Sequence, residues 1–408
     1  MLKDKAGPVS VLLSGKFETG RWLRMARSSI VIPEEKTTSI DRATVWFGEP
    51  QSRWRTVLWV VFTLGVCLHF TLAYNLEMDF LDLKAYMLGA EKTPYQYRIL
   101  MMYVFQLLAT KHVVITLAQH TQQMHVPAEW QKPQKLVQIG VAMVSLFGAV
   151  LATAGTLTKL TGDRIFSRWM SLLLIYMTYA NLAPGWGLGY SFPYDTPSLM
   201  FFCLGVYLVV SGKDWLYYAL YPIAVLNRET ICFLTIFFVI WKWQELRTGE
   251  GRVTRKDALR LAAHGLAQAA IWIGLKVWLA HRFAGNIYDY GSIVTTPRVV
   301  GRVMLNLHEL VRPQQWPAFL SVFGFLLPVV WLQRRWIQNG GIYWGLKILI
   351  PLWFVGMFFM GLLPELRIFS ELSSLLTLAL GLIVYHRFSP VADARNPIPV
   401  VSQPPRNT

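Results

Sequence analysis

Long apolar runs recur along this chain, and they constrain its fold more than any other feature. The first of them, residues 57–74, reads VLWVVFTLGVCLHFTLAY and contains no acidic residue, lysine or arginine. A helix needs about 20 mostly apolar residues to cross the hydrocarbon core of a membrane. Because 54% of all residues are hydrophobic and only 15% are charged, we predict an all-α, polytopic transmembrane helical bundle.

The apolar runs predict about ten transmembrane helices. They are expected at residues 56–75, 136–157, 168–182, 197–211, 215–226, 229–243, 260–283, 315–333, 343–363 and 371–386. Residues 99–118 are also apolar, but Lys111 and His112 interrupt them. That interruption favours a helix that lies in the membrane interface and does not cross. The transmembrane domain is therefore expected at residues 56–388, between an N-terminal tail, 1–55, and a C-terminal tail, 389–408.

The distribution of basic residues predicts the orientation in the membrane. If residues 99–118 do not cross, one side of the membrane receives most of the 39 Lys and Arg. The positive-inside rule makes that side, with both tails, cytoplasmic. No organelle address is visible, so a bacterial inner membrane is expected. The net charge of +16 does not indicate a nucleic-acid partner, because the basic residues are spread over loops and do not form one face.

In this topology the unusual polar residues fall on the extracytoplasmic side. The long first outer loop, residues 76–135, and the later outer segments contain Asp79, Asp82, Tyr97, Arg98, Asp195, Arg228, Glu229, Glu365, Arg367 and Glu371. Ionisable residues at membrane depth are costly, and they mark either function or a paired structural site. The sequence therefore predicts a polar cavity that opens outward.

These residues also have structural interpretations, which the sequence leaves open. Acidic residues after a helix are common in solvated loops and as helix caps, and tyrosine and arginine are common at membrane interfaces. The structural alternatives are a loop or cap for Asp79 and Asp82, an interfacial anchor for Tyr97, snorkelling for Arg98, a mutual ion pair for Arg228 and Glu229, and a salt-bridge ladder for Glu365, Arg367 and Glu371.

Three short stretches carry a resemblance to a known family. They are YNLEMDFLDLKAYMLGAEKTPYQYRIL (residues 74–100), NRET (227–230) and PELRIF (364–369). Together with the expected topology of residues 56–386, they resemble the GT-C superfamily of membrane glycosyltransferases. In that family the first helix leads into a long extracytoplasmic loop, which begins with an essential acidic residue and continues with helices on the membrane surface.

The resemblance implies a GT-C-like bundle that transfers a sugar in cell-envelope glycan assembly. The donor would be a polyprenyl-phosphate sugar, and the acceptor a hydroxyl of a glycan, lipid or protein. Asp79 is the expected catalytic base, with Asp82 second. Binding of substrate or phosphate is expected first at Arg228 and Arg98, then at Glu229, Glu365, Arg367, Glu371, Asp195 and Tyr97. The family allows a divalent metal ion as cofactor, but no residue pattern in this sequence requires one.

Other classes of membrane protein compete with this interpretation. They are an acyltransferase or polysaccharide polymerase, a secondary transporter or flippase, and a non-enzymatic scaffold. Membrane acyltransferases depend on a histidine, whereas His112 and His120 have no neighbouring aspartate in the sequence. A transporter is expected to carry charges near the middle of the membrane, and Lys276 is the one clearly central charge. The sequence contains no phosphate-binding Walker loop, Gly-x-Ser-x-Gly elbow or His-Glu-x-x-His zinc motif.

Overall fold

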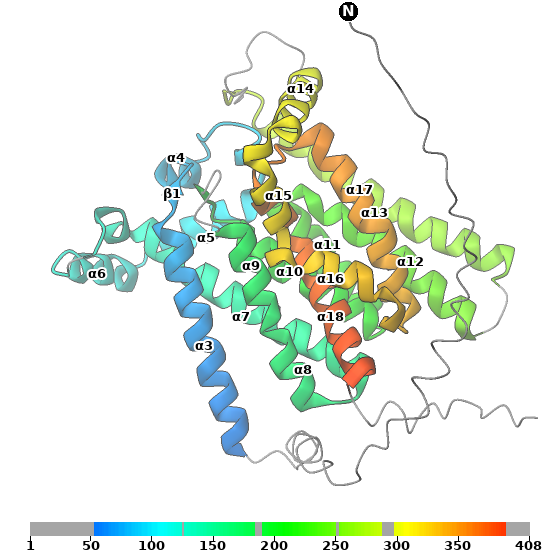
Figure 1. Cartoon of the computed structure of the whole chain (residues 1–408). Helices are drawn as coiled ribbons and strands as arrows, with labels where there is room; N and C mark the ends of the chain where they lie inside the picture. Colours follow the sequence, from blue (N-terminus) through cyan, green and yellow to red (C-terminus); the bar gives the residue numbers. More distant parts are fainter. Residues whose placement is uncertain (1–52, 125, 184–189, 250–252, 288–297, 389–408) are drawn as a thin grey trace, which may run out of the picture. The chain divides into compact units, whose positions relative to one another are not determined.

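A computed structural model describes residues 53–124, 126–183, 190–249, 253–287 and 298–388 of the chain (Figure 1). The two predicted tails lie outside these ranges, except for residues 53–55, which begin the first described helix. The all-α, polytopic character predicted from the sequence is confirmed, because helices form nearly all of the regular structure in the described residues.

Nine α-helices are longer than ten residues: α3 (Arg53–Leu76), α7 (Pro133–Thr161), α10 (Asp195–Val210), α11 (Asp214–Asn227), α12 (Cys232–Gly249), α13 (Arg255–Arg282), α14 (Arg298–Val311), α17 (Gly340–Met360) and α18 (Ser373–Phe388), as far as the chain is described. The shorter ones are α4 (Leu83–Leu88), α5 (Ile99–Leu108), α6 (His112–Thr121), α8 (Arg164–Ser171), α9 (Leu173–Leu182), α15 (Trp316–Ser321) and α16 (Leu326–Gln333). The 3-10 helices are η1 (Tyr95–Tyr97), η2 (Ala128–Gln131), η3 (Glu229–Ile231), η4 (Pro313–Gln315), η5 (Val322–Phe325), η6 (Arg334–Trp336) and η7 (Leu366–Leu372).

Six helical segments of the described chain are long and apolar enough to cross a membrane, fewer than the sequence predicted. They are α3, α7, α13, Pro313–Trp336, α17 and Leu366–Phe388. The predicted spans at 168–182, 197–211, 215–226 and 229–243 form helices that fail this test. Helix α10, for example, has 16 residues, and at 1.5 Å per residue it covers about 24 Å of the roughly 30 Å hydrocarbon core.

Helix α10 is short because it lies inside the protein. Eleven of its 16 residues are buried, and it packs against α7, α11 and α12. Backbone that ends or bends at membrane depth is tolerated where surrounding protein satisfies its polar groups. The apolar run at 197–211 therefore reflects burial among other helices, which hydropathy alone does not distinguish from contact with lipid.

The predicted interfacial segment, residues 99–118, forms two helices. Helix α5 and helix α6 meet at an angle of 84°, with the break at residues 109–111. The interruption by Lys111 and His112 seen in the sequence is therefore a real bend, and the pair would add a seventh span only if it crossed as a broken helix. Its placement in the interface stays a prediction.

The contacts between helix ends fall at two ends of the bundle. At one end, here called the Asp79 end, Ser191 contacts Asp79, Asn227 donates to the carbonyl of Tyr194, and Ser198 donates to Glu371. The opposite end, here called the Arg168 end, contains the contacts Arg168–Thr56, Lys242–Asp214 and Arg387–Gln333. In Figure 1 the strand β1 (Met78–Asp79) lies at the upper end of α3, and α8 lies towards the lower end.

Helices α12 and α17 pack closely because a glycine faces a tryptophan. A Cβ atom added to Gly341 would lie 2.3 Å from the ring of Trp241, which is itself buried. Gly341→Ala should therefore lower the free energy of unfolding by about 1–3 kcal/mol, because the rigid ring must move. Denaturant unfolding of the purified protein in detergent measures this change.

Gly274→Ala is the matched control, because a Cβ atom at Gly274 meets nothing within 4 Å. It should leave stability unchanged or slightly raised, since alanine favours a helix interior more than glycine does. Equal losses in the two variants would contradict close packing at Gly341.

Candidate functional site

Asp79 is held at the end of α3 by a two-residue parallel strand pair. Strand β1 pairs with β2 (Tyr190–Ser191), so that Asp79 lies opposite Ser191. The two segments are more than a hundred residues apart in the chain, and the pairing brings the segment before α10 against the segment after α3. The position of Asp79 is therefore fixed by backbone hydrogen bonds, and it is not on a free loop.

One oxygen of the Asp79 carboxylate is held by two side chains. Lys135 Nζ lies 2.6 Å from Asp79 Oδ1, and Ser191 Oγ donates a hydrogen bond to the same oxygen. Gln138 Nε2 donates to Ser191 Oγ in turn. The other oxygen, Oδ2, has no partner among the described residues, and 15% of the Asp79 side chain is exposed. The carboxylate is thus oriented by one oxygen and open at the other.

Lys135 is a residue of this site that was not predicted from the sequence. Its side chain is 2% exposed and lies in the first turn of α7. A lysine in the first turn of an otherwise apolar helix is a signal that could have been noticed, because burying an ammonium requires a nearby anion. Its carboxylate partner, however, lies 56 residues away in the sequence, so the pairing itself was not visible.

A cavity of about 880 Å³ opens beside Asp79. Both predicted catalytic acids line it, and its wall combines acidic, basic and apolar side chains, namely Asn75, Leu76, Glu77, Asp79, Leu81, Asp82, Leu83, Lys84, Pro127, Glu129, Trp130, Lys132, Gln134 and Lys135. We call this the Asp79 pocket. Lys84 has no carboxylate partner among the described residues, whereas Lys132 pairs with the exposed Glu129 at 2.6 Å.

Asp82 is the N-cap residue of α4, which was one of the two roles considered for it from the sequence. Its side-chain oxygen accepts hydrogen bonds from the backbone N–H groups of Lys84, at 2.9 Å, and Ala85, at 3.2 Å. These are two of the unpaired donors at the start of α4. Asp82 therefore lines the Asp79 pocket, but its hydrogen bonds are those of a helix cap.

A second polar group centres on Asp195, which is fully buried. Its Oδ1 accepts from Arg228 Nη1 at 3.2 Å and from Arg367 Nη1 at 3.4 Å. Its Oδ2 accepts from the hydroxyl of Tyr74 at 3.0 Å. A buried carboxylate with these three donors is well compensated. The contacts favour a structural role for Asp195, as the residue that joins two arginines.

Glu371 and Glu365 provide the remaining carboxylates of this group. Glu371 lies 3.2 Å from Arg228 Nη1 and accepts from the hydroxyls of Ser198 and Thr230, both at 2.7 Å. Glu365 lies 2.7 Å from Arg367 Nη2. The predicted ladder of Glu365, Arg367 and Glu371 is therefore only half present, because Glu371 pairs with Arg228 instead.

Arg98 and Glu229 form a third pair, 3.2 Å apart. The guanidinium of Arg98 stacks on the ring of Tyr194 at 4.1 Å. Burial lowers the pKa of Arg98, but the Glu229 carboxylate and Tyr194 outweigh this effect and hold that pKa above its usual range. The predicted ion pair between neighbours Arg228 and Glu229 is not the one that forms, since each pairs with a distant residue.

The short segment Tyr190–Asp195 connects all of these groups. Ser191 donates a hydrogen bond to Asp79, and the ring of Phe192 lies 3.7 Å from the guanidinium of Arg367. The ring of Tyr194 stacks against the guanidinium of Arg98. Asp195 accepts hydrogen bonds from Arg228 and Arg367. The structure thus brings nine of the predicted site residues to one end of the bundle. The tenth, Tyr97, packs among apolar side chains next to them.

The three arginines and their carboxylate partners have a net charge close to zero. We call this group the arginine cluster; its arginines are Arg98, Arg228 and Arg367. Its three guanidinium groups face four carboxylates, those of Asp195, Glu229, Glu365 and Glu371. Three buried guanidinium N–H groups, at Arg98 Nη1, Arg228 Nε and Arg367 Nε, have no hydrogen-bond partner within the described part of the chain. Because the carboxylates outnumber the guanidinium groups by one, the cluster is better suited to shape the site than to attract an anion.

Within the residues described, no group of three or more His, Cys, Asp or Glu side chains is arranged to hold a metal ion. Comparison of the chain with protein-family models, curated proteins and solved structures finds no match. The site is therefore interpreted from its own geometry and chemistry.

Proposed function

We propose that this chain is an integral-membrane glycosyltransferase that moves a sugar from a polyprenyl-phosphate donor to an acceptor hydroxyl at the extracytoplasmic face. The observation that carries the proposal is Asp79 in its pocket, directly after the first membrane helix, with one oxygen held and the other open. The resemblance to the GT-C superfamily implies an essential acidic residue at this place, just after the first helix.

The two oxygens of the Asp79 carboxylate have different roles: one orients the side chain and the other accepts a proton. Lys135 and Ser191 hold Oδ1, so that Oδ2 accepts the proton of the attacking hydroxyl as the new glycosidic bond forms. The bond between the sugar and the phosphate breaks on the opposite side of the anomeric carbon. A carboxylate is basic enough for this step, because the hydroxyl becomes acidic only as it attacks.

The departing phosphate requires positive charge, and in the Asp79 pocket we assign this role first to Lys84, which has no carboxylate partner among the described residues. Lys84 and Lys132 line the pocket near its acids. Lys84 is a better candidate than Arg228, which ranked first from the sequence, because Arg228 is 3% exposed and already has two carboxylate partners. The apolar Leu76, which is 64% exposed, lines the same pocket and offers a surface for the start of the prenyl chain.

One observation favours a second candidate function, secondary transport. The segment Pro313–Trp336 is broken at η5, where Phe323 and Phe325 have φ angles of 59° and 63°. The break is stabilised by Asn181, whose oxygen accepts from the N–H of Phe323 at 2.8 Å. Discontinuous membrane helices are typical of substrate sites in transporters.

Transfer assays with a panel of sugar donors distinguish glycosyl transfer from secondary transport. Membranes that contain the chain, and matched membranes that lack it, are offered labelled polyprenyl-phosphate sugars and, for comparison, nucleotide sugars. We expect label to appear in a glycan or lipid product only from the polyprenyl-phosphate donors. If no donor is consumed, and proteoliposomes instead accumulate a labelled solute, the glycosyltransferase proposal fails and transport replaces it.

Two lysines of the pocket should affect transfer in different ways. Lys135→Gln should lower kcat by roughly tenfold to a hundredfold with little change in KM, because Asp79 loses its orientation. Lys84→Gln should instead raise the KM for the donor by about tenfold, the loss expected for one contact to a charged group. Steady-state kinetics on purified protein measure both constants, and equal effects of the two variants on kcat would contradict the separate roles.

A further inference from the structure

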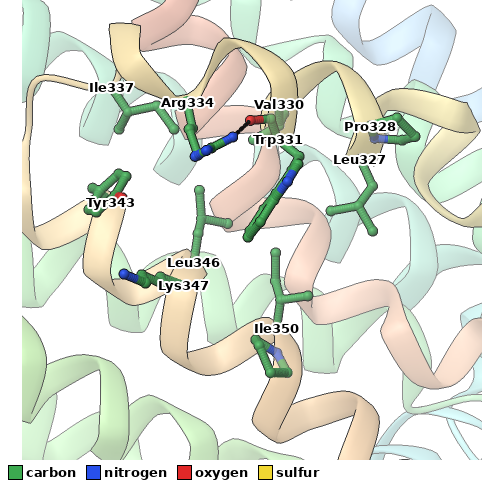
Figure 2. A pocket seen from close by; sticks show the side chains of 11 residues that line it. Leu327, Pro328, Val330, Trp331, Arg334, Ile337, Tyr343, Leu346, Lys347 and Ile350 are labelled. Carbon is green, nitrogen blue, oxygen red and sulfur yellow. Dashed lines mark hydrogen bonds between the residues drawn. The ribbon is translucent and has the colours of Figure 1, made fainter.

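A groove of about 520 Å³ lies between α16 and α17, away from the Asp79 pocket (Figure 2). Its wall is mostly apolar and is formed by Leu327, Pro328, Val330, Trp331, Arg334, Ile337, Tyr343, Leu346, Lys347, Ile350 and Pro351. Two prolines line it. Pro351 lies inside α17 and provides no N–H for the carbonyl one turn earlier, that of Lys347, so the helix lacks one backbone hydrogen bond beside the groove.

Two cations border this apolar groove, and no described carboxylate pairs with either. Arg334 donates to the carbonyl of Trp331 at 2.8 Å and stacks on the Trp331 ring. Lys347 lies 4.5 Å from the ring centre of Trp344. In Figure 2 Arg334 and Lys347 lie on the same side of the groove, with Leu327 and Pro328 on the other. The groove therefore has a cationic side and an apolar side.

The position of the cations in the membrane makes their lack of partners informative. Arg334 directly follows α16, at the Arg168 end of the bundle. Lys347 lies seven residues after the start of α17, about 10 Å along the helix. A charge at such a depth is costly unless it reaches the interface or pairs with an anion. Both side chains are exposed, so an anion could approach them from the lipid.

We infer that this groove binds an anionic phospholipid, with the headgroup phosphate between Arg334 and Lys347 and an acyl chain along the apolar wall. The charges favour a negative headgroup over a zwitterionic one, because basic pockets between membrane helices attract anionic lipids. Trp331 and Tyr343 fit the boundary between headgroup and acyl chain, where aromatic side chains are favoured. This inference is independent of the proposed sugar transfer.

Lipid titration of the purified chain in detergent tests the inference, with binding followed by native mass spectrometry. The probes are phosphatidylglycerol and phosphatidylcholine with the same acyl chains. We expect tighter binding of phosphatidylglycerol, and an increase in its Kd of about fivefold in each of Arg334→Gln and Lys347→Gln, the effect of losing one cation near a phosphate. Ile350→Trp, which fills the groove, should weaken binding of both lipids.

Arg335→Gln is the matched control. Arg335 is also exposed and adjacent in sequence, but it does not line the groove, so its Kd should stay within about twofold of wild type. Soluble glycerol phosphate should not compete, because it lacks the acyl chain. Equal affinity for the two lipids, or an equal loss in Arg335→Gln, would overturn the site, as would competition by glycerol phosphate. A structure in which a second copy of the chain covers the groove would also overturn the site.

Discussion

Asp195→Asn should lower the free energy of unfolding by about 3–5 kcal/mol, the usual cost of removing one partner from a buried ion pair. Asparagine keeps the size of the side chain but removes the negative charge that Arg228 and Arg367 share. Both arginines are buried, so water cannot replace the lost carboxylate. Denaturant unfolding of the purified protein in detergent micelles measures the loss.

Glu129→Gln is the control for this prediction, because Glu129 also belongs to an ion pair but its side chain is 60% exposed. Exposed pairs contribute about 1 kcal/mol or less. A loss in Asp195→Asn no larger than that in Glu129→Gln would contradict the view that Asp195 holds the arginine cluster together.

The positions of the helices could be predicted from the sequence, because apolar runs record burial in lipid or protein. Each predicted span contains a helix or a broken pair of helices. Hydropathy does not tell a lipid-facing helix from one enclosed by protein, and so α10 was counted as a full span. The break at η5 was also missed, since Phe323 and Phe325, which have positive φ, carry no sequence signal for a turn, and the single glycine between them, Gly324, is a weak one.

The gathering of polar residues at one end could be predicted from topology, but their pairing could not. Arg228 shows why. Its backbone is extended, with φ −159° and ψ 137°, so the side chains of Arg228 and its neighbour Glu229 point in different directions. Arg228 then meets Asp195 and Glu371, and Glu229 meets Arg98. Contacts over such sequence distances depend on helix packing, which local patterns do not encode.

Asp79→Asn should lower kcat for sugar transfer at least about a hundredfold, the contribution of a positioned general base. Asparagine can still contact Lys135 and Ser191, so the pocket should keep its shape, but it cannot accept the proton of the acceptor hydroxyl. KM for the donor should change little, since Asp79 acts on the acceptor.

Asp82→Asn provides the sharpest comparison. Asp82 lines the same pocket, and asparagine preserves its capping of α4, so that variant should keep most of the activity. The decisive measurement is the rate of sugar transfer from a polyprenyl-phosphate donor by wild type, Asp79→Asn and Asp82→Asn, purified and reconstituted at equal amounts. The proposed function predicts loss of transfer in Asp79→Asn alone; a wild-type rate in Asp79→Asn would contradict it.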